Sequence, residues 1–307
     1  MGIYSENRVL DSFTETAYAT LLKKGYIVEP ESFKEINYGI SFKVNCAEKK
    51  KSVSVTIYHT EKNGFSFVTP DKEIKAILQL LVADTGTAGC DEAGKGDFFG
   101  PLVTASFVLG EKETPVLKLG IKDSKKMKTD EIMNVYKTIS RDYPDSFSVV
   151  KIMPERYNTF YTDLAKQGKN LNDMLTWAHS KALSSLSEKR NDIKKVVVDR
   201  FTQNRYLLDK ISSSSKTAPV EFMTRAESIP SVAIASIIAR AEYLNSLKHI
   251  SETVLEEKFK LISGSGTASD ILLKDIIDSF GENVAQKICK THFFNYSKLC
   301  VKNSETD

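Results

Sequence analysis

The sequence lacks the features that mark membrane and secreted proteins. No apolar run approaches the ~18 residues that predict a membrane-spanning helix. Secretory signals have a basic region followed by an apolar one, and the opening MGIYSENRVLDSF lacks this layout. The cysteines form no C-x-x-C pair, which argues against a disulfide framework or a structural zinc site; they are Cys46, Cys90, Cys289 and Cys300. We therefore predict a soluble cytoplasmic protein with reduced thiols and no membrane partner.

A strong excess of charge of one sign is also missing. The 307 residues carry a net charge of +3, which permits a polyanionic partner without indicating one. Repeats and low-complexity tracts are absent as well. With 41% hydrophobic and 27% charged residues, the chain has enough apolar side chains for a packed core, which excludes global disorder. Its length suits one large domain or two smaller ones.

Residues 1–80 predict a small α+β unit. Apolar residues at helical spacing mark one helix over 10–21 and another over 74–81. Alternating runs between them predict antiparallel strands at 38–45, 52–58 and 65–68. This arrangement leaves one face of the sheet free. The lysine run 49–51 falls in a turn, where we interpret it as a solvated loop.

From about residue 85 the pattern becomes that of an α/β domain of roughly 200 residues. Apolar strands are predicted at 102–109, 147–153, 195–199 and 220–223. Helical patterns lie between or after them, at 129–142, 171–188 and 230–247. Continuous β-branched runs between helices are typical of central strands covered on both faces.

The segment GCDEAGKGDFFGP, residues 89–101, has the densest functional signal. It nearly matches a phosphate-binding Walker A loop, but Gly96 replaces the required Ser or Thr, and Asp91 and Glu92 would repel a phosphate. We therefore favour a carboxylate site. The glycines allow a ligand to approach the backbone closely, and acids beside a polyanion are favourable only with divalent cations between them. A plain turn with solvated acids is the alternative.

Two further acids lie at the ends of predicted elements. Asp199 ends the strand over 195–199, where α/β sheets usually place their sites, although it could instead cap a following helix. Glu227 precedes a helix that starts at Pro230, with Ser228 at its entry, and could simply interact with the helix dipole. Together with Asp91 and Glu92 they make four carboxylates, a set that can hold two hard cations.

Five motifs in order, spread over residues 85–295, together resemble bacterial ribonuclease HIII, a type 2 ribonuclease H. They are DEAGKGDFFGP (91–101), KDSKK (122–126), NLN (170–172), VDRF (198–201), and AES with SVAIASIIAR (226–240). The resemblance implies an α/β fold in which residues 85–307 form a ribonuclease H-like mixed sheet flanked by helices. It also implies that residues 1–80 are a substrate-binding domain similar to the TATA-box-binding protein fold. The long N-terminal part, and a Glu as the fourth acid, are similar to the HIII branch rather than the HII branch.

The resemblance implies a metal-dependent endonuclease that cleaves the RNA strand of RNA–DNA hybrids and leaves 5′-phosphate and 3′-hydroxyl ends. It implies a monomer with two divalent cations, Mg²⁺ or Mn²⁺. The ligands and catalytic residues would be Asp91, Glu92, Asp199 and Glu227. The substrate-binding residues would be Gly94, Lys95 and Gly96, which contact the 2′-hydroxyl. Ser124 and Lys125, which match a phosphate-contacting segment, would also bind the substrate.

The sequence departs from the family in two places. Relatives commonly carry a Pro-Lys-Gly-Ala-Gly-like stretch after the small-residue helix, whereas this chain has LISGSG at 261–266 without a lysine. Arg225 also stands where lysine is frequent.

We interpret His179 and His292 as structural rather than as metal ligands, because no His pair has metal-binding spacing. Residues 157–158 and 170–172 are predicted as polar loop positions that support the site or face the substrate. Two other functions remain open: a DNA-cleaving metal nuclease of the same fold, and a hybrid-binding protein without catalysis.

Overall fold

The computed structural model describes residues 7–46, 51–61, 64–82, 85–215 and 218–301. Most of the lysine run at 49–51 therefore lies outside the described residues. Among the residues described, no helix is both long and apolar enough to cross a membrane.

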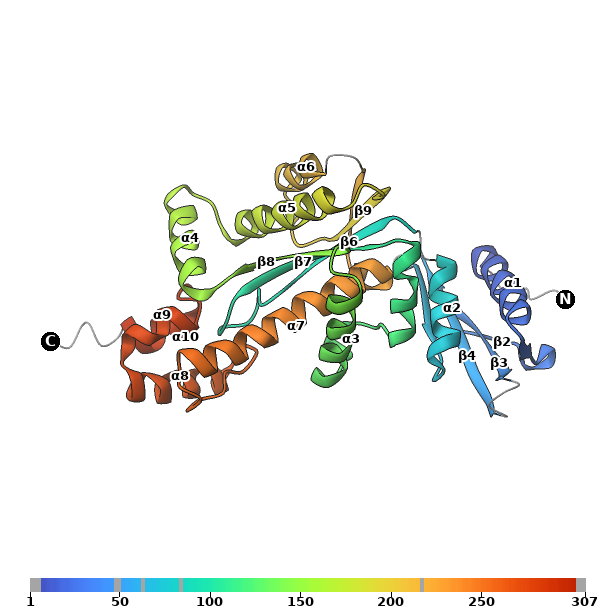
Figure 1. The fold of residues 1–307 in the computed structure, drawn as a ribbon, viewed down its shortest axis with the longest axis horizontal. Helices are drawn as coiled ribbons and strands as arrows, with labels where there is room; N and C mark the ends of the chain where they lie inside the picture. Colours follow the sequence, from blue (N-terminus) through green and yellow to red (C-terminus); the bar gives the residue numbers. More distant parts are fainter. Residues whose placement is uncertain (1–6, 47–50, 62–63, 83–84, 216–217, 302–307) are drawn as a thin grey trace.

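The N-terminal part is an antiparallel sheet with two helices on one face (Figure 1). The strands pair in the order β1-β3-β4-β5, and β2 pairs with β3. The elements are α1 (Arg8–Lys23), β1 (Tyr26–Val28), β2 (Lys34–Ile36), β3 (Gly39–Cys46), β4 (Lys51–Thr60), β5 (Gly64–Val68) and α2 (Lys72–Val82). The three longer strands and both helices confirm the sequence prediction, whereas the short β1 and β2 were not predicted.

Side-chain alternation decides which face of this sheet is covered. Ile40, Phe42 and Val44 of β3 point to the helices and join one apolar cluster with Leu21 of α1 and Leu78 of α2. The intervening residues of β3 and β4 point to the other face, which no helix of the described chain covers. This free face is rich in hydroxyl groups, from Ser41, Ser52, Ser54, Thr56 and Tyr58. Lys43 adds a cation, opposite Ser54 in the register.

The second sheet has the strand order β10-β9-β6-β7-β8. Its strands are β6 (Thr87–Ala93), β7 (Leu102–Leu109), β8 (Phe147–Ile152), β9 (Lys195–Asp199) and β10 (Val220–Met223). β7 runs antiparallel to both of its neighbours, β6 and β8, whereas β9 and β10 run parallel to β6. The predicted mixed sheet is thus observed, and β6 and β7 each have a neighbouring strand on both sides.

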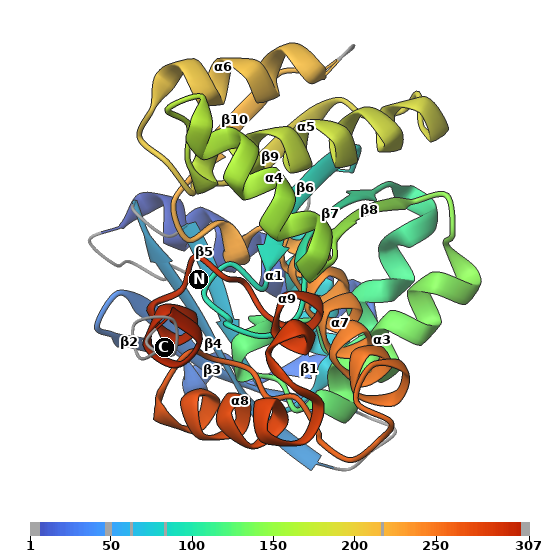
Figure 2. The ribbon, with the colours of Figure 1, turned by 90° about the vertical axis from the view of Figure 1, so that its left-hand side faces the viewer.

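Helices cover both faces of this sheet, as Figure 1 shows. One face carries α3 (Thr129–Asp142) and the long α7 (Pro230–Thr253), and the other carries α5 (Leu171–Lys189) and α6 (Arg205–Ser214). At one end lie α4 (Pro154–Lys166), α8 (Thr267–Phe280), α9 (Ala285–Ile288) and α10 (Phe294–Tyr296) (Figure 2).

The central strand β6 contacts both helix layers alternately. Gly89 faces α7 so closely that a Cβ there would lie 2.2 Å from the backbone nitrogen of Val232. Cys90 faces the other way and packs with Leu183 and Leu186 of α5. Odd-numbered residues of β6 therefore point to α7 and even-numbered residues point to α5.

Several sequence expectations were wrong in detail. Tyr157 and Asn158 are not in a loop but in α4, where the Asn158 side chain hydrogen-bonds the backbone of the C-terminal segment, including the carbonyl of Cys289 at 2.9 Å. Ser228 does not cap α7, because it belongs to a short 3₁₀ helix and Ile229 occupies the cap position without a side-chain hydrogen bond. Helices α4, α6 and α8 were not predicted, and α7 continues beyond residue 247.

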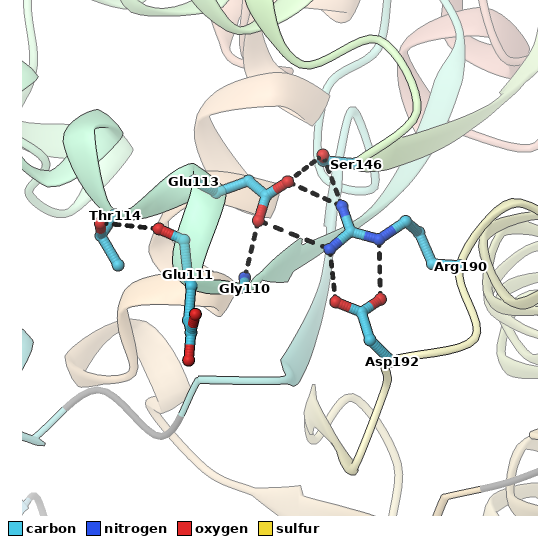
Figure 3. A network of polar contacts seen from close by, with 7 residues as sticks. All are labelled: Gly110, Glu111, Glu113, Thr114, Ser146, Arg190 and Asp192. Carbon is cyan, nitrogen blue, oxygen red and sulfur yellow. Dashed lines mark hydrogen bonds and ion pairs between the residues drawn. The ribbon is translucent and has the colours of Figure 1, made fainter.

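The far end of the sheet, where β6 begins, has a polar network around a buried acid (Figure 3). Glu113, 2% exposed, accepts hydrogen bonds from the Gly110 backbone nitrogen (2.9 Å), from Ser146 (2.6 Å) and from Arg190 (2.7 Å). Arg190 also pairs with Asp192 at 2.6 Å. These residues line a cleft of about 720 Å³. The charges of Glu113, Arg190 and Asp192 are paired with one another. The network lies at the end of β6 remote from Asp91, so we interpret it as structural.

Candidate active site

Two neighbouring parallel strands bring the candidate acids to one edge of the sheet. Asp91 and Glu92 lie near the end of β6, and Asp199 is the last residue of β9. These strands pair with Cys90 opposite Val198, so their carboxyl ends meet. Glu227 lies in the 3₁₀ helix η4 (Ala226–Ser228), immediately before α7. The fold therefore brings Asp91, Glu92 and Asp199 to the carboxyl ends of two adjacent strands and Glu227 to the turn before α7.

Asp91 is buried, with 9% of its surface exposed. Its Oδ1 accepts a hydrogen bond from the Glu92 backbone nitrogen at 2.8 Å, and Ser236 of α7 also hydrogen-bonds its carboxyl group. Burial, together with the charges of Glu92 and Asp199, raises the pKa of Asp91 to about 8, although the bond from Ser236 acts in the opposite direction. Within the described residues, no basic side chain forms an ion pair with it.

Asp199 links the end of β9 to η4. Its Oδ1 accepts a hydrogen bond from the Ala226 backbone nitrogen at 3.1 Å. Burial raises the pKa of Asp199, and the charges of Glu227 and Glu92 add to that effect. The alternative role as a cap of the following helix is wrong, because Asn204 caps α6.

Glu92 points to the opposite face of the sheet from Asp91 and is held by two bases. His179 Nε2 of α5 lies 3.2 Å from its Oε2, and Lys95 Nζ lies 3.6 Å from its Oε1. Burial opposes ionisation, yet the hydrogen bond from His179 and the charge of Lys95 keep the pKa of Glu92 below its usual value. Glu92 is therefore an ionised carboxylate with two basic partners, whereas Asp91 has none in the described part of the chain.

Burial and the neighbouring carboxylates raise the pKa of Asp91 and of Asp199, but the oxygens of the four acids are not gathered around one point. Across the described ranges, no three His, Cys, Asp or Glu side chains converge closely enough to hold a metal ion. The donor set still fits a hard divalent cation, because all donors are carboxylate oxygens and Asp91 is buried among like charges without a cationic partner. Closing the set requires rearranged side chains, and Lys95, which is paired with Oε1 of Glu92, is one that would have to move.

The two glycines of the turn beside the acids, Gly94 and Gly96, differ in whether the fold leaves room for a side chain. Gly94 has φ +86°, and a Cβ there would lie 2.1 Å from the carbonyl oxygen of Pro101, so the turn itself excludes a side chain. Gly96 is exposed, and no atom lies within 4 Å of a Cβ placed on it. The protein's own packing therefore does not require a glycine at 96. Lys95 between them is 36% exposed.

The KDSKK segment meets the acids from the side. Ser124 is buried and its Oγ lies 2.9 Å from that of Ser236, the residue that also bonds Asp91. Its hydroxyl thus faces the protein and not the solvent. Lys125 is exposed and close enough for its charge to oppose the raised pKa of Asp199.

Sequence reasoning assigned no role to Asp97 and Lys290, which hold the glycine turn in place. Asp97 Oδ1 accepts a bond from the Gly264 backbone nitrogen at 2.6 Å, and its carbonyl accepts one from the fully buried Lys290 Nζ at 2.7 Å. The LISGSG segment therefore contacts the site through its backbone although it lacks a lysine. The unusually buried lysine has no sequence signal, because only the tertiary fold encloses it.

The N-terminal sheet reaches the same region. Its edge strand β5 lies alongside η4, the turn that carries Glu227, and α2 packs on the 3₁₀ helix over Glu111–Leu119. The N-terminal part therefore borders the turn that carries Glu227.

In architecture the chain is a ribonuclease H-like α/β protein. Its structure is similar to that of Bst-RNase HIII in complex with Mn²⁺, with a TM-score of 0.65 and 22% identity over 95% of this chain and 97% of the other. Ribonuclease H2 from Pyrococcus horikoshii is similar over only 72% of this chain, but over 99% of its own length, with a TM-score of 0.58 and 21% identity.

The sequence comparison defines the family. Residues 88–296 match the model of the ribonuclease HII family. Ribonuclease HIII from Listeria monocytogenes is 33% identical over 278 residues, which cover 82% of this chain and 87% of that protein. The chain belongs to this family of ribonucleases H, and within it to ribonuclease HIII.

Proposed function

We propose that this ribonuclease H cleaves the RNA strand of RNA–DNA hybrids as an endonuclease, with two divalent cations, Mg²⁺ or Mn²⁺, held by Asp91, Glu92, Asp199 and Glu227. One observation carries the assignment of these residues. Asp91 is buried among like charges and has no described cationic partner, an arrangement that a bound divalent cation would relieve. The family name and the Mn²⁺ complex of Bst-RNase HIII support the same reading.

The reaction is the addition of water across the P–O3′ bond. Water adds to phosphorus, O3′ leaves and takes up a proton, and the products carry a 5′-phosphate and a 3′-hydroxyl. Bound cations would supply a water of lowered pKa and stabilise charge on the leaving oxygen. The chain's own contribution is positioning: Ser236 holds Asp91, Ala226 holds Asp199, and His179 with Lys95 holds Glu92.

Selection of RNA is assigned to the turn Gly94–Lys95–Gly96. The open space at Gly96 lets a ribose approach the backbone, and the 2′-hydroxyl is the group that distinguishes RNA from DNA. Lys125, exposed beside the acids, is assigned to a backbone phosphate. Ser124 supports Asp91 through Ser236 rather than contacting phosphate with its hydroxyl.

We assign residues 1–80 to a substrate-binding domain and 85–307 to a catalytic domain. The free face of the N-terminal sheet offers hydroxyls and Lys43, groups that bind phosphate and sugar oxygens. Its edge strand β5 lies beside η4, so a duplex on this face would extend to the acids. Lys43→Ala should raise KM for hybrid with kcat unchanged and lower the salt slope of binding by about 1.

We assign the active form to a single copy in the cytoplasm. One chain contains both the proposed binding face and the acids, and Cys90 and Cys289 are buried free thiols. Light scattering of the enzyme with and without hybrid would reveal any dimer.

The decisive experiment compares the parent enzyme with Asp91→Asn on labelled duplexes. The parent should cut a hybrid with Mg²⁺ or Mn²⁺, spare an all-DNA duplex and stop in EDTA, whereas Asp91→Asn should lose at least 100-fold in kcat. Cleavage of all-DNA duplex would identify a DNA nuclease of this fold. Hybrid binding without any cleavage would identify a non-catalytic binder.

A further inference from the structure

His179 is the only histidine of the described chain that contacts one of the candidate metal ligands. It is completely buried on α5, yet its Nε2 reaches Oε2 of Glu92 at 3.2 Å. Its Nδ1 has no hydrogen-bond partner among the described residues. An ionised carboxylate only accepts hydrogen bonds, so the ring must carry a hydrogen on Nε2 to make this contact. The ring therefore has one polar function in this structure, which is to donate to Glu92.

The ring itself is fixed from the side. It stacks on Phe201 with the centroids 5.2 Å apart and the planes 11° from parallel. Phe201 follows Asp199 by two residues, so the same ring that orients His179 belongs to the loop after a second candidate ligand. Lys95 Nζ lies 5.7 Å from the centroid of Phe201 as well. Phe201 thus supports both bases that hold Glu92.

The position of Glu92 explains why it requires such support. Asp91 and Glu92 are adjacent in β6 and point to opposite faces of the sheet. To share a cation with Asp91, the longer Glu92 side chain must bend round the strand end, and it has three rotatable bonds with which to adopt other positions. A donor fixed on α5 selects one of those positions.

The two bases differ in how firmly they bind. His179 is rigid and fully enclosed, whereas Lys95 is 36% exposed and lies in the turn assigned to the substrate. If Lys95 moved to a phosphate or sugar oxygen of the substrate, Oε1 of Glu92 would become available while Oε2 stayed with the imidazole.

We propose that His179 is a positioning residue which clamps Oε2 of Glu92 and thereby presents Oε1 to a divalent cation. The proposal rests on the function proposed above, because it takes Glu92 to be a metal ligand. His179 does not itself coordinate metal, since its Nε2 is directed at the carboxylate. Loss of a hydrogen bond that orients a metal ligand typically lowers metal affinity or activity 10–100-fold.

The test compares two replacements at one position. His179→Phe keeps a flat ring against Phe201 but removes the donor, and His179→Gln restores an N–H near the position of Nε2. Leu183→Val is the matched control, because Leu183 is buried on the same face of α5 and packs on β6 without contacting an acid. Thermal melts identify the folded variants, and His179→Leu replaces the Phe variant if the latter does not fold.

Mn²⁺ binding to the enzyme without substrate is measured by calorimetry, and KM and kcat for hybrid are measured over a range of Mg²⁺. We expect His179→Phe to bind Mn²⁺ 10–100-fold more weakly and to need correspondingly more Mg²⁺, with KM for hybrid at saturating Mg²⁺ unchanged. His179→Gln should lie within about threefold of the parent, as should Leu183→Val. Metal affinity retained in a folded Phe variant would overturn the proposal, as would equal losses in the Phe and Gln variants.

Glu92→Gln separates this inference from the proposed function. If Glu92→Gln binds Mn²⁺ as well as the parent, the metal site itself is wrongly assigned. If Glu92→Gln weakens binding but His179→Phe does not, only the positioning role fails. In the Glu92→Gln background, adding His179→Phe should cause no further loss, because the group it orients is no longer a carboxylate.

Discussion

Removing Arg190 should destabilise the protein through Glu113, the acid buried at the far end of the sheet. Arg190→Met keeps much of the length of the side chain but removes the cation that bonds Glu113 at 2.7 Å. Glu113, 2% exposed, then retains only Ser146 and the Gly110 nitrogen as partners. Breaking a buried ion pair in this way usually costs about 3–5 kcal/mol.

The two bonds that remain to Glu113 put the expected loss near the lower limit, at about 3 kcal/mol in the free energy of unfolding. Asp192, the second partner of Arg190, is 47% exposed, so Asp192→Asn should cost less than about 1 kcal/mol. Glu113→Gln in the Arg190→Met background should recover part of the loss, because it removes the unpaired charge.

The sign of the pH dependence gives a second check. Burial opposes ionisation of Glu113, but the bonds from Arg190 and Ser146 keep its pKa below the ordinary 4.5. The stabilisation that Glu113 contributes to the parent protein is therefore fully present above the pKa of its carboxyl group in the unfolded chain. It is lost as the pH falls through the pKa of that group in the folded protein. In Arg190→Met burial dominates, so Glu113 takes up a proton more readily. The stability difference between variant and parent should narrow on acidification.

Urea unfolding, followed by circular dichroism and by the fluorescence of Trp177, measures these differences. Activity per folded molecule should not change, because the network lies at the other end of β6 from Asp91. An Arg190→Met variant within 0.5 kcal/mol of the parent, or an Asp192→Asn variant equally unstable, would refute the reasoning.

Three further outcomes are expected. Gly96→Ala should have the melting temperature of the parent but a KM for hybrid about tenfold higher, because the space at this position is open only until substrate binds. Gly94→Ala should lower the melting temperature. Equal melting temperatures for the two variants would contradict this prediction. Burial lowers the pKa of Lys290 to about 7, so the unfolded chain binds more protons above that pH. The free energy of unfolding of the parent, relative to that of Lys290→Met, should accordingly rise from pH 7 to 10 by at most about 1.4 kcal/mol per pH unit. Melting temperatures of parent and variant that change with pH in parallel would contradict this prediction. Ser236→Ala should weaken Mn²⁺ binding, because Asp91 loses the hydrogen bond that favours its ionised form; unchanged calorimetric affinity would argue against that role.

Sequence patterns predicted the elements that are strongly periodic or uniformly apolar. The strands β7 and β9 and the helices α3 and α5 were located to within a residue or two, because the strands are uniformly apolar and the apolar residues of the helices recur at helical spacing. The helix α4 was not predicted, because most of its residues are polar and exposed and only three are buried: Pro154, Tyr157 and Leu164. The short edge strands β1 and β2 depend on pairing with β3, which local sequence does not reveal.

The four acids could be predicted because their spacing follows strand ends and a family motif. Their partners could not, because those contacts join residues far apart in the chain. His179 and Glu92 are 87 positions apart, and Ser124 and Ser236 are 112 apart. Ser236 was within a quoted motif, yet only the packing of α7 against β6 reveals that it faces Asp91.

The pair of hydroxyls between the KDSKK segment and Asp91 makes the two events at this site interdependent. Ser236 lies between the two groups: its Oγ is 2.9 Å from that of Ser124, in a hydrogen bond that either hydroxyl can donate, and it also hydrogen-bonds the Asp91 carboxyl group. A shift of the lysine-rich segment when it docks on a duplex would reach Asp91 through this chain of two bonds. Linkage then requires reciprocity: whatever a hybrid does to cation affinity, the cation must do to hybrid affinity in equal measure.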